Sequence, residues 1–394
     1  MRSASRSADR VRMDGGRRSA IAAIVCGAAF AVLAPACRSR GDEIRIGAYL
    51  SLSGADSTFG TDTRDGIELA ASEVNAAGGV RGKKVRILVE DDQSKPGEAS
   101  NKVRQLIDRD GAVALLGEVS SSRSIVGGII ANQRHVPMVT PSSTAVDVTV
   151  GREYVFRTCF TDAQQGDVAA RFVHDTRHLD RAAILWVPQE SYSRGLSETF
   201  RASFTRLGGQ IVADKAYQKG ETNFTTYLQE IRAASPPAIF IPVYYNDVVQ
   251  IARQAKAIGL SGSLFVGGDA WDSQDLLDGA GAELEGAFIT DHYAPDVPWE
   301  NSKAFLRAFR ERYGHEPGSM SAQGYDAAKL LFDAIGRASD VTPAAVKDAL
   351  ASTRAFQGAT GTLTIDAHHN ANKPIVIAQI RDKKFSYYTQ LLAD

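Results

Sequence analysis

Five short clusters of polar or aromatic residues each follow a run of residues with the pattern of a buried β-strand. Hydroxyl groups, phenol rings, a carboxylate and glycine-rich backbone can together hold a small charged molecule. In parallel α/β sheets such molecules bind beyond the carboxyl ends of the strands, where helices begin with free N–H groups. The pattern therefore predicts one ligand-binding site to which two separate parts of the chain contribute. The clusters are residues 119–122, 140–144, Tyr192, 244–245 and 267–269.

The first residues of the chain predict export. Six arginines precede Ile21, an apolar run covers residues 21–33, and small residues lead up to Cys37. This order is typical of a secretory signal peptide over residues 1–36, and the apolar run is too short to span a bilayer. A cysteine at this position resembles the bacterial lipobox, so we expect lipidation of Cys37 and an anchor or linker over residues 37–41. Ordinary cleavage before an unmodified cysteine is the alternative, and Met13 is a possible second start.

Composition limits the kinds of site that the rest of the chain can hold. Cys159 is the only thiol after Cys37, so no intrachain disulfide is expected in the folded part. From residue 38 onward the net charge is near −5 without a concentrated basic stretch, which argues against nucleic-acid binding. His174 and His178 are four residues apart on a predicted helix, but no third ligand is evident. We therefore predict neither a metal site nor a cofactor.

The hydrophobic periodicity predicts two α/β lobes. Short apolar runs bounded by Gly, Pro or charged residues indicate strands, and the stretches between them have helical spacing. About 357 residues remain after residue 37, which favours two domains. Strands that alternate with helices indicate a parallel, doubly wound sheet in each lobe. The predicted strands are 44–50, 85–89, 112–116 and 136–140, then 182–187, 211–216, 238–243 and 264–266, and finally 362–365, 375–380 and 385–391. The predicted later helices are 192–207, 224–233, 246–258, 302–313 and 323–338.

A set of motifs, in order along nearly the whole mature chain, resembles the branched-chain amino-acid-binding proteins of ABC transporters. The motifs are residues 44–47 with 52–54, 78–83, 91–92, Gly117 with 120–122, 141–144, Arg157 with Asp162 and 165–166, Tyr192 with Gly195, 250–259 and 267–269. The resemblance implies a type I periplasmic binding fold, in which two Rossmann-like lobes are joined by a hinge of three crossovers. It also implies an N-terminal lobe of residues 42–162 plus 292–365 and a C-terminal lobe of residues 163–291 plus 366–394.

The resemblance implies a role for six residues around a zwitterionic amino acid. Ser121 and Thr144 match the positions whose hydroxyl and backbone N–H groups hold the ligand carboxylate. Ser142 matches the backbone carbonyl that accepts from the ammonium, and Asp269 matches the acidic residue that pairs with it. Tyr192 and Tyr244 match the aromatic pair that covers the ligand when the cleft closes, and a ring face can also attract the ammonium.

A second set of residues is expected to contact the ligand side chain, because these residues align with the apolar subsite of the family. The set is Phe59, Val119, Ser120, Trp271 and Met320. An aliphatic or aromatic amino acid is the expected ligand, and the membrane permease of an ABC transporter is the expected partner. Two alternatives stay open, namely an amide or urea-type ligand and a sensing role in which the protein signals to a receptor.

Catalysis is not expected. The first predicted strand is followed by residues 51–56, which contain no G-x-G-x-x-G dinucleotide motif. The chain also has no G-x-x-x-x-G-K-[ST] phosphate-binding loop and no G-x-S-x-G nucleophile elbow. The sequence is therefore interpreted as that of a binding protein and not of an enzyme.

Overall fold

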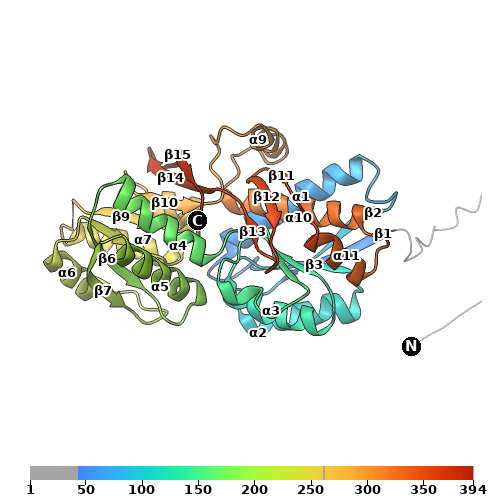
Figure 1. Ribbon diagram of the computed structural model, residues 1–394, viewed down its shortest axis with the longest axis horizontal. Helices are drawn as coiled ribbons and strands as arrows, with labels where there is room; N and C mark the ends of the chain where they lie inside the picture. The colour runs from blue at the N-terminus through green and yellow to red at the C-terminus, as the bar shows by residue number, and fades with distance from the viewer. Residues whose placement is uncertain (1–42, 261, 394) are drawn as a thin grey trace, which may run out of the picture. The chain divides into compact units, whose positions relative to one another are not determined.

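A computed structural model of the protein describes residues 43–260 and 262–393. Its first sheet has five parallel strands in the order β2-β1-β3-β4-β5, of which β1, β2 and β3 are labelled in Figure 1. All five carboxyl ends therefore lie at one edge of the sheet, as a doubly wound arrangement requires. The strands are β1 (Glu43–Leu50), β2 (Lys84–Asp91), β3 (Ala114–Leu116), β4 (Met138–Thr140) and β5 (Val155–Arg157).

Helices cover both faces of this sheet because their apolar sides pack against the buried strand residues. The closest helix pair is α1 with α10, where the backbone approaches so tightly that a Cβ on Gly66 would lie 1.9 Å from the Ser321 carbonyl oxygen. The buried side chains form one core with α1, α10 and α11 and another with α2 and α3. The helices are α1 (Ser57–Ala76), α2 (Pro96–Arg104), α3 (Ser121–Gln133), α10 (Ser319–Arg337) and α11 (Pro343–Ala351).

The second sheet has seven strands in the order β15-β14-β10-β9-β8-β6-β7. Five of them are parallel, whereas β14 is antiparallel to both β10 and β15. The strands are β6 (Arg181–Trp186), β7 (Gln210–Ala216), β8 (Ala238–Phe240), β9 (Leu264–Gly267), β10 (Phe288–Asp291), β14 (Ile375–Arg381) and β15 (Lys384–Leu391). The accompanying helices are α4 (Asp162–Arg171), α5 (Ser191–Arg206), α6 (Thr225–Ala234), α7 (Tyr245–Ala257) and α8 (Gln274–Ala280). We refer to the two sheets with their helices as the first and second lobes.

The chain crosses between the lobes three times, after β5, after β10 and between β13 and β14. The segment between the last two crossings forms α9 (Glu300–Tyr313), α10, α11 and a small antiparallel sheet beside the first lobe. That sheet consists of β11 (Phe356–Gly358), β12 (Gly361–Ile365) and β13 (Ala371–Asn372). β13 pairs with β12, and Ala371 packs in the core formed with α1, α10 and α11. This pairing favours a last crossing after Asn372 and not at residue 365.

The predicted parallel α/β sheets are confirmed, and each predicted strand overlaps an observed one. The sequence did not predict the short strands β5, β10, β11 and β13, and it did not predict the helices α4, α8 and α11. The exact bounds of the two lobes stay a prediction. The predicted signal peptide, Cys37 and the linker lie outside the described residues. Within residues 43–260 and 262–393, no helix has the length and apolar character needed to cross a membrane.

Candidate functional site

Nine of the eleven residues predicted for the ligand site line one small cavity between the lobes. The cavity has an empty volume of about 210 Å³ and is lined by side chains from both lobes. All six residues predicted to hold the ligand backbone line this cavity, and so do three of the five residues predicted to contact the ligand side chain. The lining residues are Phe59, Val119, Ser121, Ser142, Thr144, Tyr192, Tyr244, Asp269, Ala270 and Met320.

The first-lobe wall of the cavity is built from the start of α3 and the turn after β4. Ser120 has the extended backbone of an N-cap, so α3 begins at Ser121 with N–H groups that have no partner inside the helix. The Ser121 hydroxyl accepts from the Ala145 N–H at 3.1 Å. This bond connects the start of α3 to the turn after β4. Helix N-termini favour anions, so this wall is suited to a carboxylate.

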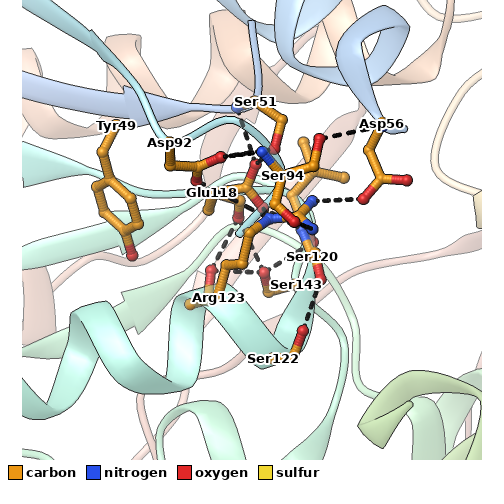
Figure 2. A network of polar contacts seen from close by, with 12 residues as sticks. Tyr49, Ser51, Asp56, Asp92, Ser94, Glu118, Ser120, Ser122, Arg123 and Ser143 are labelled. Carbon is orange, nitrogen blue, oxygen red and sulfur yellow. Dashed lines mark hydrogen bonds and ion pairs between the residues drawn. The ribbon is translucent and has the colours of Figure 1, made fainter. Parts of the chain in front are cut away.

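A buried polar network centred on Glu118 supports this wall (Figure 2). The Glu118 carboxylate accepts from the Ser51 N–H and hydroxyl, the Ser120 N–H and the Arg123 Nε, at distances of 2.6 to 3.1 Å. Glu118 and Asp92 have no exposed surface and Arg123 is 4% exposed. The network therefore joins the loops after β1, β2 and β3 into one unit behind the cavity.

The second-lobe wall consists of Tyr192 at the start of α5, Tyr244 at the start of α7 and Asp269 after β9. The ring centroids of Tyr192 and Tyr244 are 5.5 Å apart, and Phe59 of the first lobe lies 6.2 Å from Tyr244. A Cβ on Gly268 would lie 2.2 Å from the Tyr192 hydroxyl, so only glycine admits the ring at this place. The aromatic rings thus close the cavity opposite the α3 start.

Asp269 is held by two neutral donors. Gln165 Nε2 donates to one carboxylate oxygen at 2.9 Å, and His292 Nε2 lies 3.1 Å from the other. Burial lowers the pKa of His292 to about 4, against the opposing effect of the Asp269 carboxylate, so the imidazole is neutral near pH 7. His292 also stacks on Phe160 with ring centroids 3.8 Å apart. The arrangement fixes the direction of the Asp269 carboxylate without neutralising its charge.

Asp162 is a second buried carboxylate at the same place, and the sequence analysis assigned it no role. It is 1% exposed, and neither of its oxygens has a hydrogen-bond partner among the described residues. Burial and the nearby Asp269 raise its pKa well above the usual range, against the opposing effects of the Thr144 hydroxyl and Arg157. Its N–H donates to the Thr144 carbonyl at 2.8 Å, so Asp162 lies directly behind a cavity residue.

Sequence reasoning could have found Asp162, Gln165 and His292 only in part. Asp162 and Gln165 belong to a motif already noted, but nothing in their spacing indicates that they converge on Asp269. His292 follows β10, a strand that the sequence did not predict. The signal available was the position of Asp162 directly after Thr161, which caps α4 and begins it at this edge.

Two residues predicted to contact the ligand side chain, Trp271 and Ser120, are not among those that line the cavity. Trp271 is fully buried, and its Nε1 donates to the Ile241 carbonyl at 2.9 Å. A Cβ on Gly267 would lie 2.2 Å from its ring, so the indole fills the space that this glycine leaves. Ser120 instead occupies the N-cap position of α3 without a side-chain capping bond. Its N–H donates to the Glu118 carboxylate, and its hydroxyl lies 3.0 Å from that of Ser122.

The remaining candidates have structural partners. His174 Nδ1 lies 2.6 Å from the adjacent Asp175 carboxylate. Among the residues that the structure describes, no group of three His, Cys, Asp or Glu side chains is arranged to hold a metal ion. Cys159 is buried as a free thiol 3.3 Å from the Ser143 carbonyl, and burial raises its pKa to about 12.

The sequence and the fold of this chain are similar to those of known binding proteins. Residues 43–384 match the family model described as periplasmic binding protein. The leucine-binding protein LivK of Thermotoga maritima superposes with a TM-score of 0.84 at 33% identity, covering 89% of this chain and 99% of that one. The branched-chain amino acid transporter substrate-binding protein LivJ of Streptococcus pneumoniae, solved in complex with isoleucine, gives 0.83 at 29% identity with coverage of 89% and 99%. A leucine-, isoleucine-, valine-, threonine- and alanine-binding protein of Pseudomonas aeruginosa is 26% identical over 326 residues, which is 82% of this chain and 86% of that protein.

Proposed function

Because the chain belongs to the periplasmic binding protein family, we propose that it captures an amino acid outside the cytoplasm and delivers it to the membrane permease of an ABC transporter. The proposed ligand is a free amino acid with a branched-chain or other apolar side chain. Relatives whose names state leucine, isoleucine and valine as ligands support this choice.

One observation carries the proposal. The buried carboxylate of Asp269 lines a small cavity that the start of α3 also lines, and a second buried carboxyl, Asp162, lies behind the cavity residue Thr144. A buried carboxylate without a cationic partner is costly, and a ligand cation would remove that cost. A helix start that favours an anion, facing carboxylates that favour a cation, is complementary to the two ends of a zwitterion.

Each lining residue then has a role that follows from its chemistry. We assign the ligand carboxylate to Ser121 and Thr144 at the helix and turn starts. The ammonium is assigned to the Ser142 carbonyl, Asp269 and Asp162. Tyr192 and Tyr244 cover the ligand, whereas Phe59, Val119 and Met320 contact its side chain, an apolar set that favours an aliphatic group.

Titration calorimetry with three probes of similar size tests this assignment. L-Leucine carries both charges, 4-methylpentanoate lacks the ammonium and L-leucinamide lacks the carboxylate. We expect L-leucine to bind and each analogue to bind at least about 30-fold more weakly, since an unpaired buried charge costs about 2 to 5 kcal/mol. Equal binding of 4-methylpentanoate would contradict the ammonium assignment. Tighter binding of the amide would favour the alternative class of amide or urea-type ligands.

We also propose that residues 1–36 are a signal peptide and that Cys37 carries a lipid anchor. The order of basic, apolar and small residues before Cys37 supports this. In the native host the protein should fractionate with membranes, and Cys37→Ser should release it or block its processing. Wholly soluble mature protein with an unmodified Cys37 would contradict the anchor. Uptake of L-leucine by a strain that lacks this protein separates transport from sensing. Uptake should be lost if the protein serves transport and retained if it serves sensing.

A further inference from the structure

A short segment at the edge of the first lobe makes several contacts with the second lobe. This rim segment, residues 55–59, leads into α1. Tyr245 Oη donates to the Ala55 carbonyl at 3.1 Å, and the Thr58 hydroxyl bonds to the Asp275 carboxylate. The Phe59 ring meets Tyr245 edge-on with centroids 4.9 Å apart. These contacts can exist only while the lobes are together.

The rim segment is itself held to the first lobe by Asp56. The Asp56 carboxylate lies 2.8 Å from Arg123 Nη2, and its N–H donates to the Ser94 hydroxyl at 3.2 Å (Figure 2). Asp56 is 8% exposed, so the pair with Arg123 is largely screened from water. The preceding Gly54 has φ +89° and lies against the Gln93 carbonyl, so the chain enters the rim through a turn that only glycine fits.

Arg123 connects the rim segment to the start of α3. It lies two residues after Ser121 in the same helical turn and also pairs with Glu118 at 2.9 Å and with Asp92 at 3.8 Å. Of these three carboxylates, Asp56 alone belongs to the segment that contacts the second lobe. Neither Arg123 nor Asp56 lines the cavity.

The ring that covers the cavity from the second lobe also meets the rim segment. The ring centroid of Tyr244 lies 6.2 Å from that of Phe59. Closure of the second lobe thus meets the rim segment through both Tyr244 and Tyr245.

We propose that the Arg123–Asp56 ion pair is a clasp that positions the rim segment for lobe closure and so slows the release of a ligand that neither residue touches. Both residues are positioning residues. The clasp deepens the proposed function and rests on it, because the ligand anion is assigned to the same turn of α3 that carries Arg123. The contacts of the rim segment favour the closed state alone, so weakening them shifts the equilibrium toward the open state from which ligand leaves.

The test measures the kinetics of L-leucine binding to the Asp56→Asn variant by stopped-flow fluorescence. The substitution keeps the size of the side chain and removes its charge. We expect dissociation to become about tenfold faster while association changes less than about twofold, since a weakened closed state acts mainly on the release rate. A matched control is Asp108→Asn, which removes the carboxylate of an exposed Arg134–Asp108 pair of nearly equal length, 2.9 Å, and should leave both rates unchanged.

A double-mutant cycle with Tyr245→Phe separates a clasp from a general loss of stability. Tyr245→Phe removes the hydroxyl that bonds to Ala55, so Asp56→Asn should have much less effect on dissociation in that background than alone. Additive effects, or an unchanged release rate in Asp56→Asn, would overturn the clasp. A lower unfolding free energy of the ligand-free variant without faster release would overturn it as well.

Failure of the proposed function is distinguishable from failure of the clasp. If the unaltered protein does not bind L-leucine, the ligand assignment is wrong. X-ray scattering of the ligand-free protein then tests whether the Arg123–Asp56 pair favours the closed state. Asp56→Asn should then have a larger radius of gyration than the unaltered protein and the Asp108→Asn control. Equal radii for all three proteins would overturn it.

Discussion

Glu118 and Asp162 are both fully buried carboxylates near the carboxyl ends of strands, yet their surroundings differ completely. Glu118 accepts four hydrogen bonds, one of them from the charged Arg123. Neither oxygen of Asp162 has a hydrogen-bond partner of normal geometry within the described part of the chain, and the Thr144 hydroxyl favours its charged form while the Asp269 carboxylate opposes it. The first lobe thus satisfies the buried charge of Glu118 internally, whereas the raised pKa of Asp162 favours a neutral carboxyl whose charged form an incoming cation would stabilise.

The difference separates a carboxylate that supports the fold from one that can bind a ligand. A buried ion with complete partners stabilises only the arrangement that supplies them, so its removal damages folding. A buried carboxyl without partners gives the fold little and gains most from an incoming cation. Variants at the two positions should therefore affect different measurements.

The largest effect is expected for Glu118→Gln. The amide keeps the shape but loses the charge that pairs with Arg123, and its NH2 group faces the donors on Ser51 and Ser120. Breaking a buried pair costs about 3 to 5 kcal/mol, so the free energy of unfolding should fall by about that amount in urea titrations followed by circular dichroism. Glu316→Gln, which alters an exposed pair with Arg310, is the control and should cost less than about 1 kcal/mol. Similar losses for both variants would remove the distinction between Glu118 and an ordinary surface charge.

Asp162→Asn should act on binding instead. It removes one of the two carboxylates assigned to the ammonium, and a hydrogen bond to a charged group is worth about 1.5 to 3 kcal/mol. We expect calorimetry to give about 10- to 150-fold weaker binding of L-leucine. The unfolding free energy of the ligand-free protein should not fall, because the carboxyl has no partner to lose. Unchanged affinity would mean that Asp269 alone holds the cation.

His292 should show its effect in the pH dependence of stability. Its folded pKa of about 4 lies below the usual 6.5, so the unfolded chain binds more protons between these values. Stability from the neutral imidazole is therefore present above pH 6.5 and is lost as pH falls toward 4. Relative to His292→Gln, the unaltered protein should lose about 2 kcal/mol of unfolding free energy between about pH 7 and pH 4.5. Parallel pH profiles for the two proteins would show that His292 is not buried in the neutral form.

Asp92→Asn is expected to have the smallest effect. Burial, reinforced by the charge of Glu118, raises the pKa of Asp92 to about 7, so the carboxyl is largely protonated at pH 6 and resembles an amide. The substitution should change the unfolding free energy by less than about 1 kcal/mol there. Because the folded pKa is raised, the stability that Asp92 contributes is lost as pH rises through 7, and the variant should become relatively more stable by about pH 8. A loss as large as that of Glu118→Gln would show that Asp92 carries charge at pH 6.

Short-range patterns predicted the α/β architecture and the clusters at the strand ends, whereas the roles of the cavity residues, including Phe59 and Met320, came from the family resemblance. Apolar runs with helical stretches between them specify parallel strands, and parallel strands bring their carboxyl ends to one edge. The residues directly after these strands, such as Ser121 and Asp269, must therefore converge wherever the helices start. No such pattern specifies the partners of Asp269, since Gln165 and His292 reach it from separate elements.

Side-chain direction and very short strands were beyond sequence reasoning. Trp271 follows Asp269 by two residues, and only the turn between them decides that its ring packs against Gly267 and does not line the cavity. The strands β5 and β10 contain three and four residues, too few for a period to be recognised. The crossings between the lobes follow these two strands, which is why the bounds of the lobes were the least determined part of the prediction.

The packing of Trp271 over Gly267 has a consequence for the entropy of binding. The indole anchors the single helical turn of residues 269–271 to the interior of the second lobe, and Gln165 and His292 fix the carboxylate that the turn presents. The rotamer freedom of Asp269 is therefore lost when the chain folds and not when a ligand arrives. A preorganised group forfeits less conformational entropy on binding, so more of its interaction with the ligand is retained as affinity.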